Sequence, residues 1–105
     1  MGIKGIDHLY LETRHWDEST AFWKTLGFSF ADQWGQDGHR AGRLVMGEAV
    51  IVLAEAADEL TVFFSAADIA GLAEVVGEAE RTHWGTKVIR VTDPDGHTFA
   101  LEESE

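Results

Sequence analysis

The sequence predicts an α+β fold in which the order strand-helix-strand-strand-strand occurs twice. Three observations support this. Short segments alternate between apolar and polar residues, which is typical of half-buried strands. Two segments carry apolar residues at helical spacing, and each is followed by a glycine, Gly27 and Gly77. Turn residues separate the remaining strands, most clearly in the segment Asp93-Pro-Asp-Gly96. Many strands with two short helices predict a curved sheet that the helices cover on one face.

The first half begins with a strand at residues 6–12. Asp17 is expected to cap the helix that follows, and Gly27 to end it. The apolar face of that helix is expected to contain Phe22, Trp23 and Leu26. Three further strands are expected at about 28–34, 41–46 and 49–54.

The second half repeats this order from a strand at residues 60–65. Ser65 and Asp68 have the spacing of a capping box, which predicts that Ser65 caps the second helix. The apolar face of this helix is formed by Ile69, Leu72, Ala73 and Val76. The last strands are expected at about 80–84, 86–92 and 97–102.

Composition limits the classes of location and partner that we expect for this protein. The chain has 105 residues, which suits one domain, and no apolar run that could span a membrane. It has no cysteine and no apolar leader at its start, which predicts a cytoplasmic protein without disulfides or thiolate metal sites. Its net charge of −11 would repel a phosphate backbone, so neither nucleic acid nor membrane is expected as a partner.

Two segments resemble a known family. Residues 6–12, Ile-Asp-His-Leu-Tyr-Leu-Glu, and the later Leu-Gly-Phe ending at Phe28 resemble the opening of vicinal oxygen chelate proteins. This family includes glyoxalase I, bleomycin-resistance proteins and extradiol dioxygenases. Trp84-Gly85, the Asp-Pro-Asp-Gly turn and Phe99-Ala-Leu101 resemble the closing strands of that family. The resemblance implies one domain over residues 1–105, with βαβββ modules at about 3–55 and 58–103. It also implies one curved mixed sheet with a concave pocket, and helices on the convex face.

The same resemblance implies where a metal ion would bind. Enzymes of the family hold a divalent ion between ligands on the first and fourth strands of each module, and these positions correspond to His8, Val52, Thr61 and Ala100. His8 matches, but valine and alanine offer no lone pair and threonine is a poor ligand. We therefore expect no metal, no cofactor and no catalytic residue. A shifted set of His8, Glu12 and Glu102 is the alternative ligand set.

Strand alternation places the side chains of a candidate pocket. The face that carries His8 mixes small, aromatic and polar residues, as ligand pockets do, although a partner subunit could cover the same face. Trp34 and Trp84 would provide flat walls for an aromatic ligand. The basic residues near His39 could pair with a ligand carboxylate or, alternatively, with a neighbouring glutamate. The candidate ligand-binding residues are His8, Tyr10, Trp34, His39, Arg43, Val52, Thr61, Phe63, Trp84 and Ala100.

Three hypotheses for function follow. The first is a metal-independent binding protein for a small aromatic or cationic, antibiotic-like molecule. It is expected to be a homodimer, because an open concave sheet leaves apolar surface and strand edges to cover. The second is an atypical metal-dependent lyase, isomerase or dioxygenase of the same superfamily that uses His8 as a base. The third is a dimerisation or regulatory module without a small ligand. A fold by itself does not choose among them.

Overall fold

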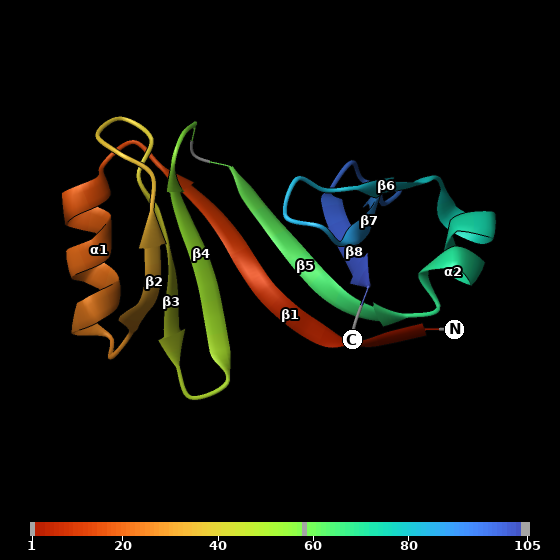
Figure 1. Ribbon diagram of the computed structural model, residues 1–105, viewed down its shortest axis with the longest axis horizontal. Coiled ribbons are helices and arrows are strands. Elements are labelled where there is room, and N and C mark those ends of the chain that lie inside the picture. Colours follow the sequence, from red (N-terminus) through yellow and green to blue (C-terminus); the bar gives the residue numbers. More distant parts are fainter. Residues whose placement is uncertain (1, 58, 104–105) are drawn as a thin grey trace. The chain divides into compact units, whose positions relative to one another are not determined.

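The computed structural model describes residues 2–57 and 59–103, and within them it contains two helices and eight strands (Figure 1). The elements in chain order are β1 (Gly2–Thr13), α1 (Trp16–Thr25), β2 (Ser29–Trp34), β3 (Ala41–Met46), β4 (Ala49–Glu55), β5 (Leu60–Ala67), α2 (Ile69–Val76), β6 (Ala79–Arg81), β7 (Lys87–Thr92) and β8 (Thr98–Glu103). The predicted α+β class and the twofold β-α-β-β-β order are confirmed.

The strands pair in the order β2-β3-β4-β1-β5-β8-β7-β6. The sheet is mixed, as expected, because β1 pairs with β4 and β5 pairs with β8 in parallel, whereas β3 and β7 pair with their neighbours in antiparallel fashion. The two halves therefore use the same pairing scheme. In each half the first strand lies beside the fourth, which a crossover through the helix permits.

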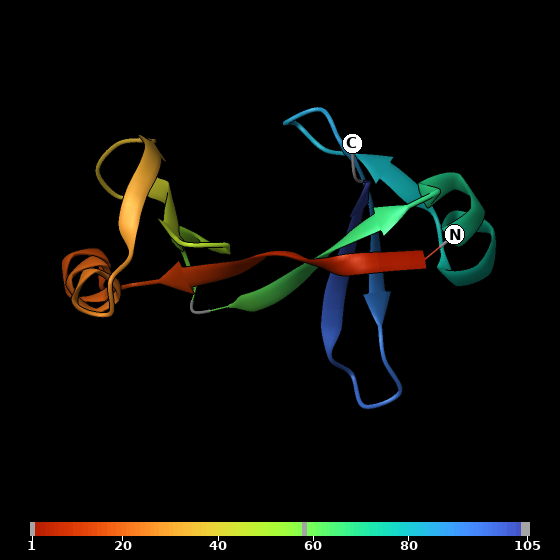
Figure 2. The same ribbon diagram turned by 90° about the horizontal axis from the view of Figure 1, so that it is seen from below.

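The chain divides into two units, which are described separately below. The first unit is His8–Leu60, and the second comprises Thr61–Glu105 with Met1–Asp7. β1 contributes residues to both, and Figure 2 shows it as a long strand that leads directly into α1. Within the described residues, neither helix has the length and apolar character required to cross a membrane.

The core of the first unit lies between its sheet and α1. Its buried members are Trp16, Phe28, Leu44, Ile51 and Leu53, and the half-buried Leu9, Leu11, Trp23 and Phe30 pack against them. The expected apolar face of α1 is only partly right, because Trp23 packs on the core but Phe22 and Leu26 are 57% and 51% exposed. Trp16, Thr20 and Trp23 follow the helical spacing i, i+4, i+7, so this stripe faces the sheet instead.

The start of α1 also differs from the prediction. The helix begins at Trp16, so Asp17 lies in its first turn and does not cap it. The capping position is His15, whose side chain makes no capping hydrogen bond, while its backbone N–H donates to Thr13 Oγ1 at 2.9 Å. Burial of the Trp16 indole against the Phe30 ring, with centroids 5.9 Å apart, favours this earlier start.

In the second unit, α2 packs on one face of the sheet. The buried residues of this core are Ala66, Ile69, Leu72, Ile89 and Leu101. The expected capping box is wrong, because β5 continues through Ala67 and Ser65 pairs with Glu102 in the β5–β8 ladder. Asp68 is itself the cap: it has a left-handed φ of 53° and accepts a hydrogen bond from the backbone N–H of Gly71. Gly77 ends α2 as predicted, although Val76 is 45% exposed.

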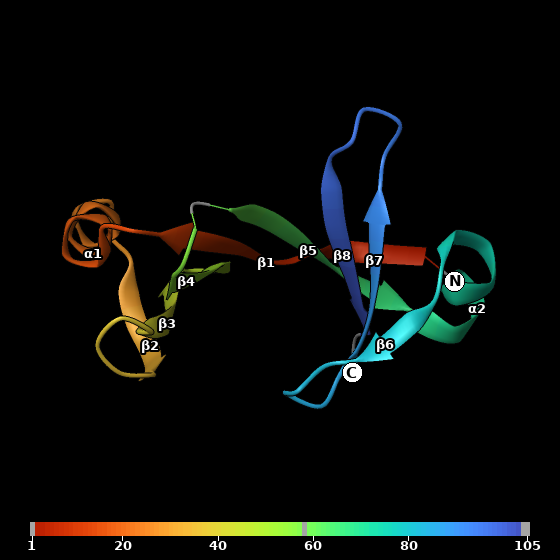
Figure 3. The same cartoon turned by 90° about the horizontal axis from the view of Figure 1, so that it is seen from above.

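The strands at the end of the chain form two successive hairpins. β7 and β8 are joined by the predicted Asp93-Pro-Asp-Gly96 turn, which lies at the tip of their hairpin in Figure 3. β6 is shorter than predicted and ends at Arg81, because residues 82–86 form a hydrogen-bonded turn before β7. This turn places Trp84 in a loop instead of a strand.

Candidate functional site

The sheet face opposite α1 carries several of the predicted ligand-binding residues of the first unit. Strand register sets Tyr10 beside Val52, Val52 beside Arg43, and Arg43 beside Asp32. The four side chains thus form one row across β1, β4, β3 and β2. Val52 is half-buried, and it offers a smooth apolar surface where the family resemblance implies a metal ligand.

A second row on the same face leads to Trp34. Glu12 pairs with Ala54, Ala54 with Ala41, and Ala41 with Trp34. Two alanines therefore occupy the middle of this row, and the Trp34 residue at its end is 51% exposed. A large flat side chain beside small ones is a feature of sites that hold planar ligands.

A register irregularity between Phe30 and Asp32 makes this arrangement possible. An extra residue in β2 lets Phe30 face α1 while Asp32 and Trp34 face away from it. Gly42 on β3 provides the necessary space, because a Cβ atom there would lie 2.5 Å from the Phe30 ring. Alternation read from the sequence alone could not include this shift.

Tyr10 is a neutral hydrogen-bond donor. Its hydroxyl donates to Glu12 Oε2 at 2.9 Å, and Glu12 Oε1 accepts the backbone N–H of Ala57 at 3.1 Å. Burial, followed by the hydrogen bond and the charge of Glu12, raises the pKa of Tyr10 to about 12. Glu12 therefore has a structural role, because both of its carboxylate oxygens already accept hydrogen bonds within this unit. His8, the first residue of this unit, is half-buried, and alternation puts it on the Tyr10 face.

Arg43 forms an ion pair with Asp32, so its acidic neighbour is an aspartate and not the expected glutamate. Its Nε donates to Asp32 Oδ2 at 3.2 Å, and the two side chains are 45% and 61% exposed. An exposed pair of this kind contributes about 0–1 kcal/mol, so a ligand carboxylate could replace Asp32 at little cost.

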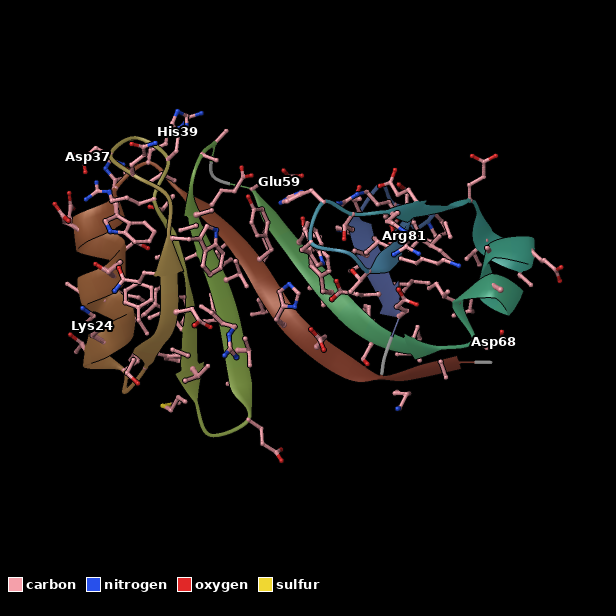
Figure 4. All side chains as sticks on the ribbon, in the orientation of Figure 1. Lys24, Asp37, His39, Glu59, Asp68 and Arg81 are labelled. Atoms are coloured by element: carbon pink, nitrogen blue, oxygen red, sulfur yellow. The ribbon has the colours of Figure 1, made fainter. Side chains whose placement is uncertain are left out.

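A surface depression of about 350 Å³ lies at the end of this unit. It is lined by Thr13, Arg14, Gly38, His39, Glu55 and Ala56. Among the predicted residues only His39 belongs to it, and Figure 4 shows His39 on the loop between β2 and β3. His39 is exposed, and its backbone N–H donates to the carbonyl of Gln36 at 2.7 Å.

Glu55 organises this loop, and the sequence reasoning missed it. Its carboxylate accepts the Arg40 backbone N–H and Nε at 2.8 Å through Oε1, and Nη2 at 3.1 Å through Oε2. These hydrogen bonds, together with one from the Gly38 backbone, hold the pKa of Glu55 at about 2. A sequence signal did exist, because an arginine just before one strand and a glutamate at the end of its hairpin partner are expected to meet.

Acid should weaken this loop. The pKa of Glu55 is about 2 in the folded protein and 4.5 ordinarily, so its stabilising effect is complete above pH 4.5 and is lost as the pH falls toward 2. We expect Glu55→Gln to destabilise the protein at pH 7 and to make its stability less dependent on pH between 4.5 and 2. Urea denaturation at several pH values measures both effects. Glu48→Gln, an exposed change in the β3–β4 turn, should leave the pH profile unchanged.

Three other predicted residues, Thr61, Phe63 and Ala100, lie on the face of the second unit opposite α2. Strand register sets Phe63 beside Ala100 and Ala100 beside Arg90, and the Arg90 guanidinium lies 5.9 Å from the centre of the Phe63 ring. Phe63 is 4% exposed, Ala100 0% and Thr61 6%. These three side chains are therefore buried and offer little open surface that a ligand could contact.

Trp84 is 49% exposed and is held by a residue that was not among the predicted contacts. Its indole Nε1 donates to Glu102 Oε2 at 2.7 Å, and Thr86 Oγ1 donates to the same oxygen at 2.7 Å. Glu102 is 9% exposed, and a carboxylate oxygen of Asp7 lies within 4.8 Å of its own. Sequence reasoning placed Glu102 on the His8 face and in the shifted metal set, but it did not pair Glu102 with Trp84, because no local pattern connects the two.

The residues at the family's metal positions do not fit a metal ion. Val52 and Ala100 have no donor atom, and Ala100 is fully buried. A separate group, Asp93, Asp95 and His97, lies in the β7–β8 turn. There Asp93 accepts the backbone N–H groups of Asp95 and His97, which lowers its pKa, so the group is accounted for by turn formation.

The comparisons concern the fold. No protein-family model matches the sequence, and no curated protein matches it. A glyoxalase/bleomycin resistance protein/dioxygenase superfamily member from Vibrio splendidus 12B01 is 17% identical, with a TM-score of 0.74 over 92% of this chain and 97% of that chain. A hypothetical protein from Bacillus halodurans C-125 is 13% identical, with a TM-score of 0.72 over 95% and 94%. A catechol 2,3-dioxygenase is 17% identical, with a TM-score of 0.69 over 99% of this chain.

These likenesses show that the chain has the vicinal oxygen chelate fold, as the sequence predicted. This chain spans 42% of the catechol 2,3-dioxygenase chain but nearly all of the first two proteins.

Proposed function

We propose that the protein binds a small, planar aromatic molecule without a metal ion, as the antibiotic-binding proteins of this superfamily do. The observation that carries the proposal is the face opposite α1. There the exposed Trp34 lies in register with Ala41 and Ala54, and Arg43 lies in the adjacent row. The indole offers a stacking surface, the alanines leave room, and the guanidinium can orient a polar group of the ligand.

Charge restricts the ligand further. The chain carries 19 acidic and 8 basic side chains, so its field favours cationic or neutral molecules over anions. The same field opposes nucleic acid, which we propose is not a partner. The absence of cysteine supports the expectation of a cytoplasmic location.

Metal retention is the first test. After incubation with Ni²⁺, Zn²⁺, Mn²⁺ or Fe²⁺ and desalting, we expect the untagged protein to retain almost no metal by mass spectrometry. Val52 and Ala100, at two of the positions where the resemblance implies metal ligands, offer no donor atom to these ions. Stoichiometric retention that His8→Ala abolishes would contradict the proposal.

Ligand binding is the second test. Calorimetric titration with acriflavine, a planar aromatic cation, should show saturable binding, and 2,3-dihydroxybenzoate tests the opposite charge. Trp34→Leu should weaken binding by about 2–12-fold, which corresponds to the loss of one aromatic contact. Phe22→Leu removes an equally exposed aromatic ring from α1 and should have no effect. Equal weakening by both variants would remove the assigned role of Trp34.

A metal-dependent lyase, isomerase or dioxygenase that uses His8 is the second candidate. The dioxygenases among the structural neighbours favour it, although at 17% identity or less they share only the fold. The metal retention experiment separates the two candidates, because an enzyme of this kind needs the ion.

We also propose that the protein is a homodimer. A small domain with exposed apolar side chains such as Ile6, Leu60 and Val75 gains stability by covering them at a twofold contact. Sedimentation velocity at micromolar concentration tests this, and a monomer would contradict it.

A further inference from the structure

We infer that Glu102 is a positioning residue, which fixes the plane of the Trp84 indole so that one part of the ring stays open to a ligand. This inference rests on the proposed binding of a planar aromatic ligand, and it adds Trp84 of the second unit as a further exposed indole that such a ligand could contact. The hydrogen bonds from which the inference is argued all lie within the second unit.

The two hydrogen bonds to Glu102 define the arrangement. Trp84 Nε1 and Thr86 Oγ1 both lie 2.7 Å from Glu102 Oε2, so one carboxylate oxygen accepts two donors from the same turn. A bond from a neutral donor to a carboxylate is short and strong, and an indole has only one donor. The N–H edge of Trp84 is therefore directed toward β8. Trp84 is nevertheless 49% exposed, whereas Glu102 is 9% exposed.

The turn that carries Trp84 is itself braced. The backbone N–H of Thr82 donates to the carbonyl of Thr86 at 2.8 Å, and that of Thr86 donates to Thr82 Oγ1 at 3.1 Å. Arg81 Nη1 donates to the carbonyl of Gly85 at 2.7 Å. A turn held in this way leaves the indole few alternative orientations, provided that its edge is also held.

A second aromatic ring, the imidazole of His83, also contacts Trp84. His83 contacts Trp84 edge to face, with centroids 4.8 Å apart and planes at 87°. A mobile indole would lose part of any stacking energy to ordering on binding, whereas a fixed one would not. Glu102 thus acts on the ligand through Trp84 and does not itself need to touch the ligand.

The test uses nuclear magnetic resonance of the indole N–H groups in the full chain, without ligand. Trp84→Phe identifies the Trp84 signal. We expect this N–H to exchange slowly with water in the unaltered protein. Glu102→Ala should accelerate its exchange by about tenfold or more, the factor that one hydrogen bond to a charged group represents. Glu102→Gln keeps the shape and one acceptor, so it should give an intermediate rate.

Glu103→Gln is the matched control. Glu103 is the next residue of β8 and accepts the backbone N–H of Lys87 at 2.6 Å, so its replacement alters a neighbouring bond and should not change the Trp84 signal. If Glu102→Ala does not fold, the ¹³C shift of the Glu102 carboxyl in Trp84→Phe gives the same information from the other partner. Unchanged exchange in both Glu102 variants, or an unchanged carboxyl shift, would overturn the inference.

Acriflavine titration of Glu102→Gln separates this inference from the proposed function. Weaker binding together with faster indole exchange supports the positioning role in the site. Faster exchange with unchanged binding overturns that role and leaves the binding function intact. Failure of the unaltered protein to bind the probe counts against the proposed function, while the exchange data still decide whether Glu102 holds the indole.

Discussion

Leu44→Ala is expected to lower the free energy of unfolding by about 2–5 kcal/mol. Leu44 is 0% exposed and lies in β3 among the buried side chains of the first unit, where it pairs in register with Ile51 and Phe30. Removing three carbon atoms there leaves a cavity that flanking strands cannot fill, because both are held by their own pairing. The midpoint of urea denaturation measures the loss.

Met46→Ala is the control for Leu44→Ala. Met46 ends the same strand and is 44% exposed, so its replacement should change stability by less than about 1 kcal/mol. If the two variants lose similar stability, the core of the first unit does not lie where the structure places it. The comparison also bears on the candidate site, since Arg43 next to Leu44 lies on the opposite face of β3.

Gly35→Ala is expected to have the second largest effect. Gly35 follows β2 with a φ of 86°, a conformation that costs an alanine about 1–3 kcal/mol. In addition, an added Cβ atom would overlap the carbonyl oxygen of His39, which is backbone and cannot rotate away. The loop would have to open, and it carries both His39 and the Arg40 that pairs with Glu55. Urea denaturation should therefore show a loss above the range for backbone strain alone.

Gly38→Ala separates the two causes. Gly38 has the same φ of 86°, but no atom lies within 4 Å of the position of its added Cβ. Its replacement should show only the backbone strain, so the difference between the two variants measures the overlap with His39. Equal losses would mean that the loop relaxes freely and that its closure contributes little.

The spacing of apolar residues and the turn residues predicted most of the helices and strands, because both are properties of each segment by itself. Alternation located β3 and β4 within one residue, and helical spacing located α2 and its end at Gly77, although not its start. The turn at residues 93–96 was equally clear, since proline and glycine restrict the backbone whatever surrounds them. The same reasoning failed where long-range pairing competes with a local signal. Ser65 has the sequence of a cap, yet pairing with Glu102 extends β5 past it.

The candidate site was predictable in part for the same reason. Tyr10 and Val52 were placed by period-two alternation, which is a property of each strand. The partners of the site residues were not predictable in this way. Trp84 meets Glu102 18 residues later, and Arg40 meets Glu55 15 residues later. Such contacts depend on which strands become neighbours and in which register.

The sequence by itself therefore determined the α+β class, the repeated order of elements, the likeness to the vicinal oxygen chelate fold and the loss of donor atoms at Val52 and Ala100. These follow from residue identity and local periodicity. Only the tertiary structure decided that Trp16 is a core residue, that Glu55 holds the loop of His39, and that Glu102 directs the indole of Trp84. The physical reason is that burial and hydrogen bonding are set by neighbours across the sheet, and these neighbours are distant along the chain.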